Sequence, residues 1–222
     1  MTHNPSGTDR QRRPRGSITA EAILDAAEEL AAEGLDALTV RAVTSSIQAS
    51  PMAFYRHFTT KDALVDALLD RVLGRFQAPP LTDEWVADLR AFAGNHRRIL
   101  QEHPWAITTL FTHPNPGLNA ARIGEEALRI LERGGIGGDR AIATFSGIIA
   151  LNYGWSAFAT ARERDGTGDP GPALDDVLSA LPVEEFALTV QSAESMSNYG
   201  SDTHFEIVLD QLLAGIASGQ TA

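Results

Sequence analysis

The most constraining feature of this sequence is a helical repeat of apolar residues that extends through most of the chain. In the last repeat, from Phe205 to Ile216, apolar residues fall at i, i+3, i+4, i+7, i+8 and i+11. This spacing places all of them on one face of an α-helix, and no segment shows the two-residue alternation of a β-strand. The sequence therefore predicts an all-α fold.

Capping residues divide the first part of the chain into short helices. Thr19 is placed to start a helix that Gly34 ends, and Thr39 is placed to start a second helix. Ser50 and Pro51 predict the start of a third, with the serine hydroxyl as the cap and the proline where its missing N–H costs nothing. We expect this third helix to span about two turns, over the sequence PMAFYRHF.

A larger helical part is predicted to follow. Apolar spacing and proline or glycine breaks predict helices over residues 61–76, 85–103, 118–131, 139–162, from about 183, and over 205–216. Residues 164–172 predict a mobile loop, because they are rich in Gly, Pro and Asp. Gly134–Gly138 predicts a linker, because it lacks the GK[ST] of a phosphate-binding loop and follows a helix.

The charge is distributed unevenly. The net charge is −11 at pH 7, but residues 1–76 carry nine Lys or Arg against ten Asp or Glu, whereas residues 77–222 carry nine against nineteen. The first third is therefore free to face phosphate groups. Residues 1–17 predict a flexible basic arm, because they lack apolar residues apart from Met1 and contain four arginines, namely Arg10, Arg12, Arg13 and Arg15.

Several classes of protein are excluded by composition and motif. The chain has no cysteine, which excludes disulfide scaffolds, thiolate metal sites and cysteine nucleophiles. It has neither an apolar run of about 18 residues nor an apolar stretch behind the N-terminal arginines, so we expect a cytoplasmic protein without a membrane partner. Ser146 has no GxSxG context. We therefore expect no enzyme, no cofactor and no metal site.

Three short helices after a basic arm are the parts of a helix-turn-helix DNA reader. The short helix of residues 51–57 is the natural recognition element, since it ends in Tyr55, Arg56 and His57 and is followed by Lys61. The alternative interpretation is a small helical hairpin with a solvated charged face. Helical spacing alone leaves both interpretations open.

The residues over 18–70 closely resemble the DNA-binding domain of the tetracycline-repressor (TetR) family. The matching positions are Ile23–Ala27, Gly34, Leu38–Arg41, Phe54–Phe58 and Lys61–Asp62. The rest of the chain looks like the ligand-binding domain of the tetracycline-repressor-like branch. The residues that carry this resemblance are His103-Pro104-Trp105 and the predicted helix of 205–216. The resemblance implies a helix-turn-helix domain over 18–64 and a ligand-binding and dimerisation domain over 65–222.

The resemblance also implies roles for individual residues on DNA. Arg41 matches a position that reaches a base edge, and Pro51, Met52 and Ala53 match positions where the recognition helix meets bases. Arg56 is placed for either a base or the backbone, and Phe54 and Phe58 are expected in the core. The positions that match phosphate contacts are Thr39, Ser50, Tyr55, His57, Thr60 and Lys61.

Two residues depart from the family pattern. Thr44 stands where the family usually has the Ala that packs at the helix crossing, and Gln48 stands where it has a turn Gly with positive φ. A side chain at that φ costs on the order of 1 kcal/mol. Weakened DNA binding is therefore one of the open alternatives.

The resemblance implies a small-molecule site and a homodimer in the C-terminal part. Candidate ligand-binding residues are Phe92, His96, His103, Trp105, Phe111, Asn152 and Trp155. Each has a structural alternative: the aromatic residues and the histidines as core, and Asn152 as a residue that sets dimer register. The helices of 142–159 and 205–216 fit either a dimer interface or the core of a large monomer.

Three functions are compared on this basis. The first is a homodimeric transcriptional regulator that acts as a repressor, binds a palindromic double-stranded DNA operator and is released by a small-molecule effector. The second is a small-molecule-binding or interaction protein with weakened DNA binding, and the third, an all-α enzyme, lacks any catalytic motif. In the first, the ligand would move the helix of about 61–76 and change the separation of the two recognition helices.

Overall fold

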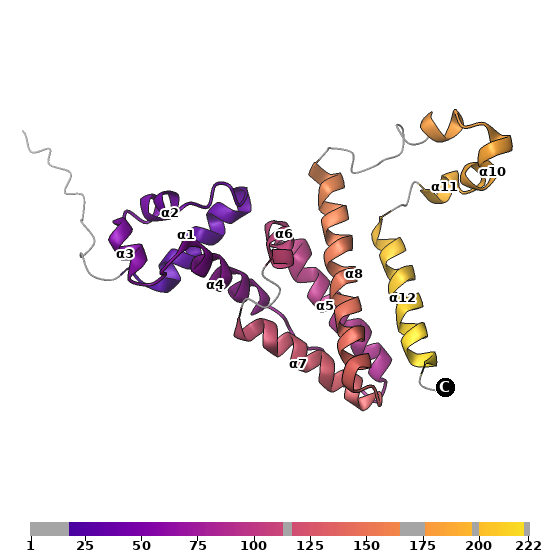
Figure 1. Cartoon of the computed structure of the whole chain (residues 1–222), viewed down its shortest axis with the longest axis horizontal. Helices are drawn as coiled ribbons and strands as arrows, with labels where there is room; N and C mark the ends of the chain where they lie inside the picture. Colours follow the sequence, from indigo (N-terminus) through magenta and orange to yellow (C-terminus); the bar gives the residue numbers. More distant parts are fainter. Residues whose placement is uncertain (1–17, 113–116, 165–175, 197–199, 220–222) are drawn as a thin grey trace, which may run out of the picture. The chain divides into compact units, whose positions relative to one another are not determined.

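The computed structural model describes residues 18–112, 117–164, 176–196 and 200–219, and its regular structure over these residues is helical (Figure 1). The chain divides into two compact units, Met1–Leu64 and Val65–Ala222. The basic arm predicted over 1–17 lies outside the described residues, and so does the predicted loop of 164–172 beyond Arg164. Among the described helices, none is long and apolar enough to cross a lipid bilayer.

The first unit contains α1 (Ala20–Glu33), α2 (Val40–Ser46) and α3 (Pro51–Tyr55). Its helix starts follow the predicted caps. The Thr19 side chain accepts a hydrogen bond from the Ala22 N–H, and the Thr39 side chain accepts one from the Ala42 N–H. Its core is built from the apolar faces of these helices and contains Ile23, Ala27, Leu38, Val43 and Phe54, all with no exposed surface.

Two details of the recognition helix differ from the prediction. The helix ends at Tyr55 rather than at residue 58, because the chain turns at Arg56 so that Phe58 can enter the core with an exposed fraction of 8%. Ser50 does stand at the N-cap with an extended backbone, but its hydroxyl makes no capping hydrogen bond. Pro51 removes one of the N–H groups that would need capping.

Helix α4 (Lys61–Leu73) begins in the first unit and continues into the second. It ends three residues before the predicted residue 76, because the next N–H groups, those of Arg75 and Phe76, bond to carbonyls three positions back rather than four.

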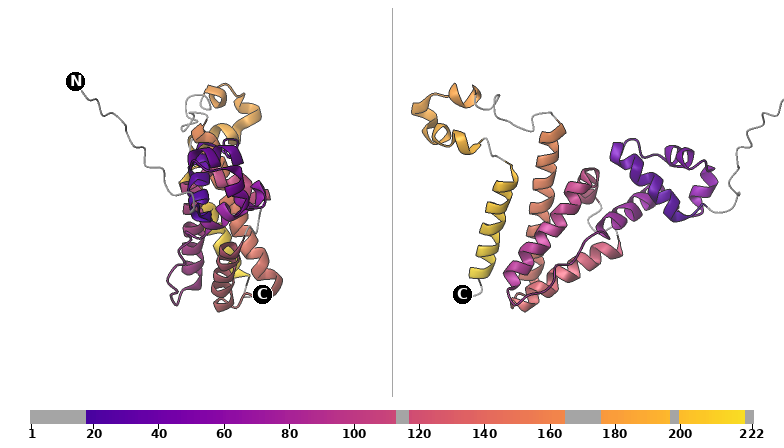
Figure 2. Two further views of the ribbon diagram at one scale, coloured as in Figure 1. Left: turned by 90° about the vertical axis from the view of Figure 1, so that its left-hand side faces the viewer. Right: turned by 180° about the vertical axis from the view of Figure 1, so that it is seen from behind.

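The remaining helices form the second unit. They are α5 (Trp85–Glu102), α6 (Pro104–Thr112), α7 (Leu118–Arg133), α8 (Gly138–Arg164), α10 (Val183–Gln191), α11 (Ala193–Met196) and α12 (Asp202–Ser218). Helix α5 is central, since it packs against α6, α7, α8 and α12. In the right-hand view of Figure 2, α5 crosses in front of α8. The apolar spacing of the sequence did not predict α6 or α11 as helices.

A buried carboxylate joins the start of α5 to the end of α7. Asp88 accepts hydrogen bonds from the Thr82 N–H and hydroxyl and from Arg133, 2.6 Å away. Burial alone would raise the pKa of Asp88, but the hydrogen bonds from Thr82 and Arg133 outweigh it and lower the pKa below its usual value. Asp88 therefore stays ionised and holds the two helix ends together.

Candidate functional site

The turn between α2 and α3 carries a strained residue, Gln48. Gln48 has a φ of 54°, the only positive φ of a non-glycine residue within the described part of the chain. The turn is held by the Ala49 N–H, which donates to the Thr44 carbonyl at 2.7 Å. The positive φ that the resemblance implied at Gln48 is therefore confirmed.

Thr44 fits where the family has Ala because its hydroxyl finds partners within its own helix. The side chain is 3% exposed. Its Oγ1 donates towards the carbonyl oxygen of Val40 at 2.8 Å and lies 3.2 Å from that of Arg41. Back-bonding of this kind satisfies a buried hydroxyl at little cost to the helix. The departure at Thr44 leaves no unpaired polar group at the helix crossing.

The residues predicted to meet bases lie on the exposed side of α2 and α3. Arg41, Pro51 and Met52 are exposed, with 68% of Met52 accessible, and Ala53 is half-buried. Phe54 and Phe58, predicted as core residues, are buried. The short recognition helix is thus fixed by aromatic residues on one side and presents Met52 and Tyr55, one turn apart, on the other.

The predicted phosphate-contacting residues Thr39, Ser50, Tyr55, Thr60 and Lys61 are also exposed. Two of their hydroxyls cap helices: Thr39 accepts from the Ala42 N–H, and Thr60 accepts from the Ala63 N–H at 3.0 Å. A hydroxyl that accepts such a bond still has its own O–H to donate. Both threonines are therefore oriented by the backbone while keeping a donor for a phosphate oxygen.

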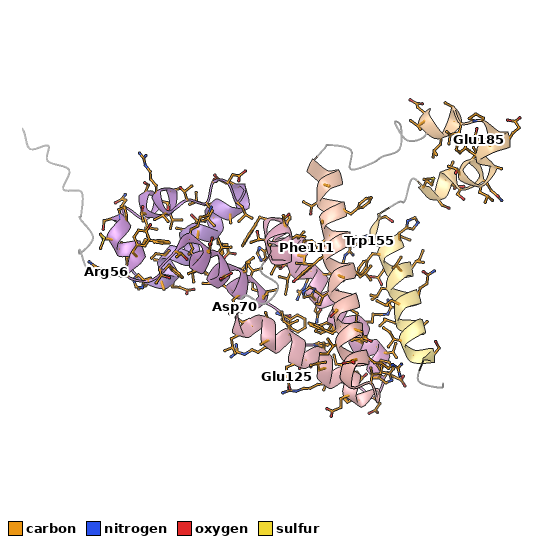
Figure 3. All side chains as sticks on the ribbon, viewed as in Figure 1. Arg56, Asp70, Phe111, Glu125, Trp155 and Glu185 are labelled. Atoms are coloured by element: carbon orange, nitrogen blue, oxygen red, sulfur yellow. The ribbon has the colours of Figure 1, made fainter. Side chains whose placement is uncertain are left out.

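His57 has a structural partner that the sequence did not indicate. Its Nε2 lies 2.8 Å from the Ile18 carbonyl and donates to it, which ties the end of the recognition helix to the residue before α1. The neighbouring Arg56 is exposed and labelled in Figure 3. Only the Nδ1 of His57 is left for any other contact.

Charge separates across the described part of this unit. Its basic side chains are Arg41 on α2, Arg56 after α3 and Lys61 at the start of α4, whereas α1 carries Glu21, Asp25, Glu28, Glu29 and Glu33. The basic side chains therefore lie on α2, after α3 and at the start of α4, where Asp62 follows Lys61, and none lies on α1.

In the second unit, aromatic rings form a continuous chain between helices. Neighbouring ring centroids lie 5.3 to 6.5 Å apart along the series Phe76, Phe92, His96, Tyr153 and Phe111. Phe145 also contacts Phe92, at 6.5 Å. The series brings together three of the predicted ligand-binding residues, Phe92, His96 and Phe111, and adds Tyr153, Phe76 and Phe145.

His96 and Asn152 form a buried polar pair within this aromatic chain. The Asn152 Nδ2 donates to the Ala93 carbonyl at 2.9 Å and to the His96 Nδ1 at 3.0 Å. Desolvation lowers the pKa of His96 to about 4, so the imidazole is neutral near pH 7. With Nδ1 accepting, the hydrogen-bond network assigns the ring proton to Nε2.

Two buried acceptors beside this pair lack a partner. The Asn152 Oδ1 and the Ser156 Oγ make no hydrogen bond among the residues that the structure describes, and the two residues are 0% and 2% exposed. They are one turn apart on the same face of α8. Unsatisfied buried polar groups are uncommon in folded proteins.

Trp155, another predicted ligand-binding residue, lies outside this series of aromatic rings. The Trp155 Nε1 donates to the Gly200 and Ser201 carbonyls, and its ring packs 5.9 Å from that of Phe205. Figure 3 shows Phe111 on the α6 side of α8 and Trp155 on the α12 side. Trp155, Gly154, Phe158 and Gly200 line a cavity of about 220 Å³.

His103 and Trp105 lie at the start of α6. Trp105 is buried, and its ring lies 6.4 Å from that of His103. His103 pairs with Arg75 just beyond α4. Sequence reasoning missed Phe76 and Phe145 as neighbours of Phe92, because Phe76 lies after α4 and Phe145 on α8, and no spacing within one helix reveals such neighbours.

These features define the class of the molecule: a helix-turn-helix DNA-binding protein that carries a separate helical domain. Its sequence matches the family described as "Bacterial regulatory proteins, tetR family" over residues 23–68, and "Tetracyclin repressor-like, C-terminal domain" over residues 78–219. The chain therefore belongs to the TetR family of transcriptional regulators.

Relatives and solved structures agree with this assignment. A helix-turn-helix transcriptional regulator of Saccharopolyspora erythraea is 32% identical over 95% of this chain and 89% of its own length. The repressor DrrR1 of Streptomyces coeruleorubidus is 29% identical over 59% of this chain and 50% of its own length. Apo ActR of Streptomyces coelicolor superposes with a TM-score of 0.82 at 25% identity, covering 94% of this chain and all of its own.

Proposed function

We propose that this regulator is a repressor that binds a palindromic operator and releases it when a small molecule binds in the second unit. The observation that carries the DNA-binding part is the construction of α2 and α3. On the inner side of these helices Phe54 is buried, and the buried hydroxyl of Thr44 bonds within its own helix. On the outer side Arg41, Met52 and Tyr55 are exposed. Such a regulator acts in the cytoplasm, where the chromosome lies, and needs no catalysis.

The proposed roles on DNA follow from chemistry and exposure. Arg41 reads a guanine edge, and Pro51, Met52 and Ala53 meet bases through apolar contacts. The hydroxyls of Thr39, Ser50, Tyr55 and Thr60, together with His57 and Lys61, contact phosphates and set the position of the domain without reading sequence. Arg56 contacts either a base edge or the phosphate backbone.

The proposed effector site is the aromatic chain around His96 and Asn152. A neutral imidazole with its proton on Nε2, the free Asn152 Oδ1 and the rings of Phe92, Tyr153 and Phe111 suit a planar ligand that carries hydrogen-bonding groups. His103, Trp105 and Trp155 are kept as further candidates. Two structural neighbours support this chemistry: ActR was solved with actinorhodin (TM-score 0.83) and a TetR variant of Acinetobacter baumannii with minocycline (TM-score 0.69), each at 24% identity.

The proposed dimer forms through α8 and α12. One side of α8 exposes a row of mostly small residues at helical spacing, namely Ala143, Ser146, Ala150, Gly154, Phe158 and Ala161. A row on α12, with Ile207, Gln211, Ala214 and Ser218, is exposed at the same kind of spacing. Small residues let helices approach closely, and a second copy using the same two helices would form a symmetric four-helix bundle.

Fluorescence anisotropy with the DNA flanking the gene, repeated across salt concentrations, tests the proposal. Selective binding that weakens with salt, and is lost on adding an effector found by the quenching of tryptophan fluorescence, is the expected result. Actinorhodin and minocycline are the first compounds to screen.

One observation favours a second function, a small-molecule-binding protein with weakened DNA binding. The strained φ of 54° at Gln48 lies in the turn that sets the recognition helix. Binding no tighter than to random-sequence DNA, with effector binding retained, would support this alternative and reject the repressor.

A further inference from the structure

Helices α4 and α7 are joined by a compact set of hydrogen bonds around Asp70. One carboxylate oxygen of Asp70 accepts the Asn119 N–H at 2.7 Å and lies 3.4 Å from the Ala120 N–H. In return, the Asn119 Nδ2 donates to the Asp70 carbonyl oxygen at 3.0 Å and to its second carboxylate oxygen at 3.1 Å. Both residues lie in the second unit, and Asp70 is labelled in Figure 3. We call this pair the Asp70–Asn119 clasp.

The clasp supplies a cap that α7 cannot supply itself. The N-cap position of α7 is Gly117, which has no side chain and makes no side-chain capping bond. The first N–H groups of a helix need acceptors, and a carboxylate is the favoured one because of the helix dipole. Asp70 therefore caps α7 from a different helix, so this cap depends on the position of α4.

Two glycines allow this close approach. A Cβ atom on Gly117 would lie 2.7 Å from the Asp70 carboxyl carbon, and one on Gly74 would lie 2.8 Å from the Asn119 Nδ2. A Cβ atom this close would force the Asp70 carboxylate or the Asn119 amide to move, so a larger residue at either position would disturb the clasp. Glycine at position 74, just after α4, and at position 117, just before α7, therefore leaves room for the two side chains of the clasp.

Helix α4 connects the clasp to the DNA-binding unit by an unbroken helix. Its first residue, Lys61, belongs to the first unit, and Asp70 follows nine residues later, which is about 14 Å along a helix. A helix of this length is stiff. A change in the contacts of the second half of α4 therefore also moves its first turn.

We propose that the Asp70–Asn119 clasp is the joint through which α7 positions α4, and thereby the recognition helices, for operator binding. Both residues are positioning residues, since neither belongs to the proposed DNA surface or effector site. The inference rests on the proposed function and adds to it the element that carries the effector signal. A ligand that shifts the first turn of α7 acts on α4 by opening the clasp.

Selective and non-selective DNA binding respond differently to such a joint. Selective binding requires the two recognition helices of a dimer to keep a fixed separation, because successive half-sites lie at a fixed distance. Non-selective binding depends on the attraction between basic groups and phosphates. Opening the clasp therefore lowers selective affinity and leaves non-selective affinity unchanged.

The test compares three variants on two DNA probes. The probes are a duplex that the wild-type protein selects from a random pool and a random-sequence duplex of equal length. Asp70→Ala opens the clasp. The exchange D70N/N119D restores part of it, because the new amide still accepts the α7 N–H groups and donates to the new carboxylate, whereas the bond from residue 119 to the residue-70 carbonyl oxygen is lost. Glu125→Ala is the control, since it removes an exposed carboxylate of α7 outside the clasp.

Asp70→Ala is expected to lose about tenfold in affinity for the selected duplex and nothing on the random duplex. D70N/N119D should recover part of the lost affinity, and Glu125→Ala should bind as the wild type does. Circular dichroism checks that each variant is folded. A folded Asp70→Ala protein with unchanged selectivity, or an exchange variant as impaired as Asp70→Ala, would overturn the proposal.

Hydrogen exchange separates this inference from the proposed function. Asp70→Ala should speed exchange at the Asn119 and Ala120 amides, and D70N/N119D should restore their protection, whether or not any DNA is bound. Unchanged exchange would reject the clasp itself. A wild-type protein that selects no duplex would reject the repressor proposal and, with it, the positioning role, while the exchange result would still report on the cap.

Discussion

Gln48 holds the most strained backbone position in the helix-turn-helix, with a φ of 54°. Gln48→Gly removes the clash between Cβ and the backbone, and we expect the free energy of unfolding to rise by about 1 kcal/mol. Urea denaturation followed by circular dichroism measures the change. Gln48→Ala is the matched control, because it keeps Cβ and should bring no such gain; an equal gain in both variants would mean that the strain is not the cause.

His96 makes stability depend on pH over a defined window. Burial lowers its pKa in the folded protein to about 4 from an ordinary value of 6.5. Between these two pH values the imidazole is protonated in the unfolded chain but not in the folded protein. The contribution of His96 to the free energy of unfolding is therefore fully present above pH 6.5. It is lost as the pH falls towards 4, and the total loss is about 3 kcal/mol.

Denaturation curves between pH 7 and about 4 test this dependence. His96→Gln keeps a side-chain acceptor for Asn152 but cannot titrate, so its stability should fall much less over the same window. Parallel curves for the two proteins would contradict a buried neutral imidazole. Asp88 does not interfere, because its lowered pKa moves its own contribution to more acidic pH.

Arg41 and Lys61 provide a contrast between reading and positioning on DNA. Arg41→Ala should cost about 1–3 kcal/mol on the selected duplex and relax specificity at one base pair. Lys61→Ala should weaken binding to all sequences alike and lower the slope of log affinity against log salt by about one. Anisotropy titrations over a salt series distinguish the two effects, and a uniform loss with Arg41→Ala would remove it from the base-reading set.

At the scale of elements, the sequence predicted helices well where an apolar face or a cap marks them. Helix α12 carries the predicted repeat and buries Phe205, Leu209 and Leu213, and α1 begins after Thr19 as its cap predicts. The errors are at short helices. Helix α6 follows α5 after only His103, and Pro104 was interpreted as an end when it is also the first residue of the next helix.

The exposed row of small residues on α8 gives a test at the scale of the whole molecule. Ala150→Glu places a carboxylate in the middle of this row, and in a symmetric dimer the two copies bring like charges together. We expect a cost of about 3 kcal/mol, roughly a hundredfold in the dimer dissociation constant.

Analytical ultracentrifugation measures the change, and selective DNA binding should weaken in parallel. Ala121→Glu is the matched control, because it makes the same substitution at an exposed position of α7. A dimer that tolerates Ala150→Glu would place the interface on another surface.

The sequence by itself determined the helical class, most helix boundaries, and the face that each helix buries, because these depend on residue spacing within one helix. The family signature was also local, since it lies in one continuous stretch around Phe54–Phe58. Only the tertiary structure decided which polar groups meet. Asp70 caps α7, His57 binds the Ile18 carbonyl, and the Trp155 N–H turns to Gly200 rather than to the His96 pair. Helical periodicity fixes which face a side chain occupies, but its partner depends on how separate helices pack.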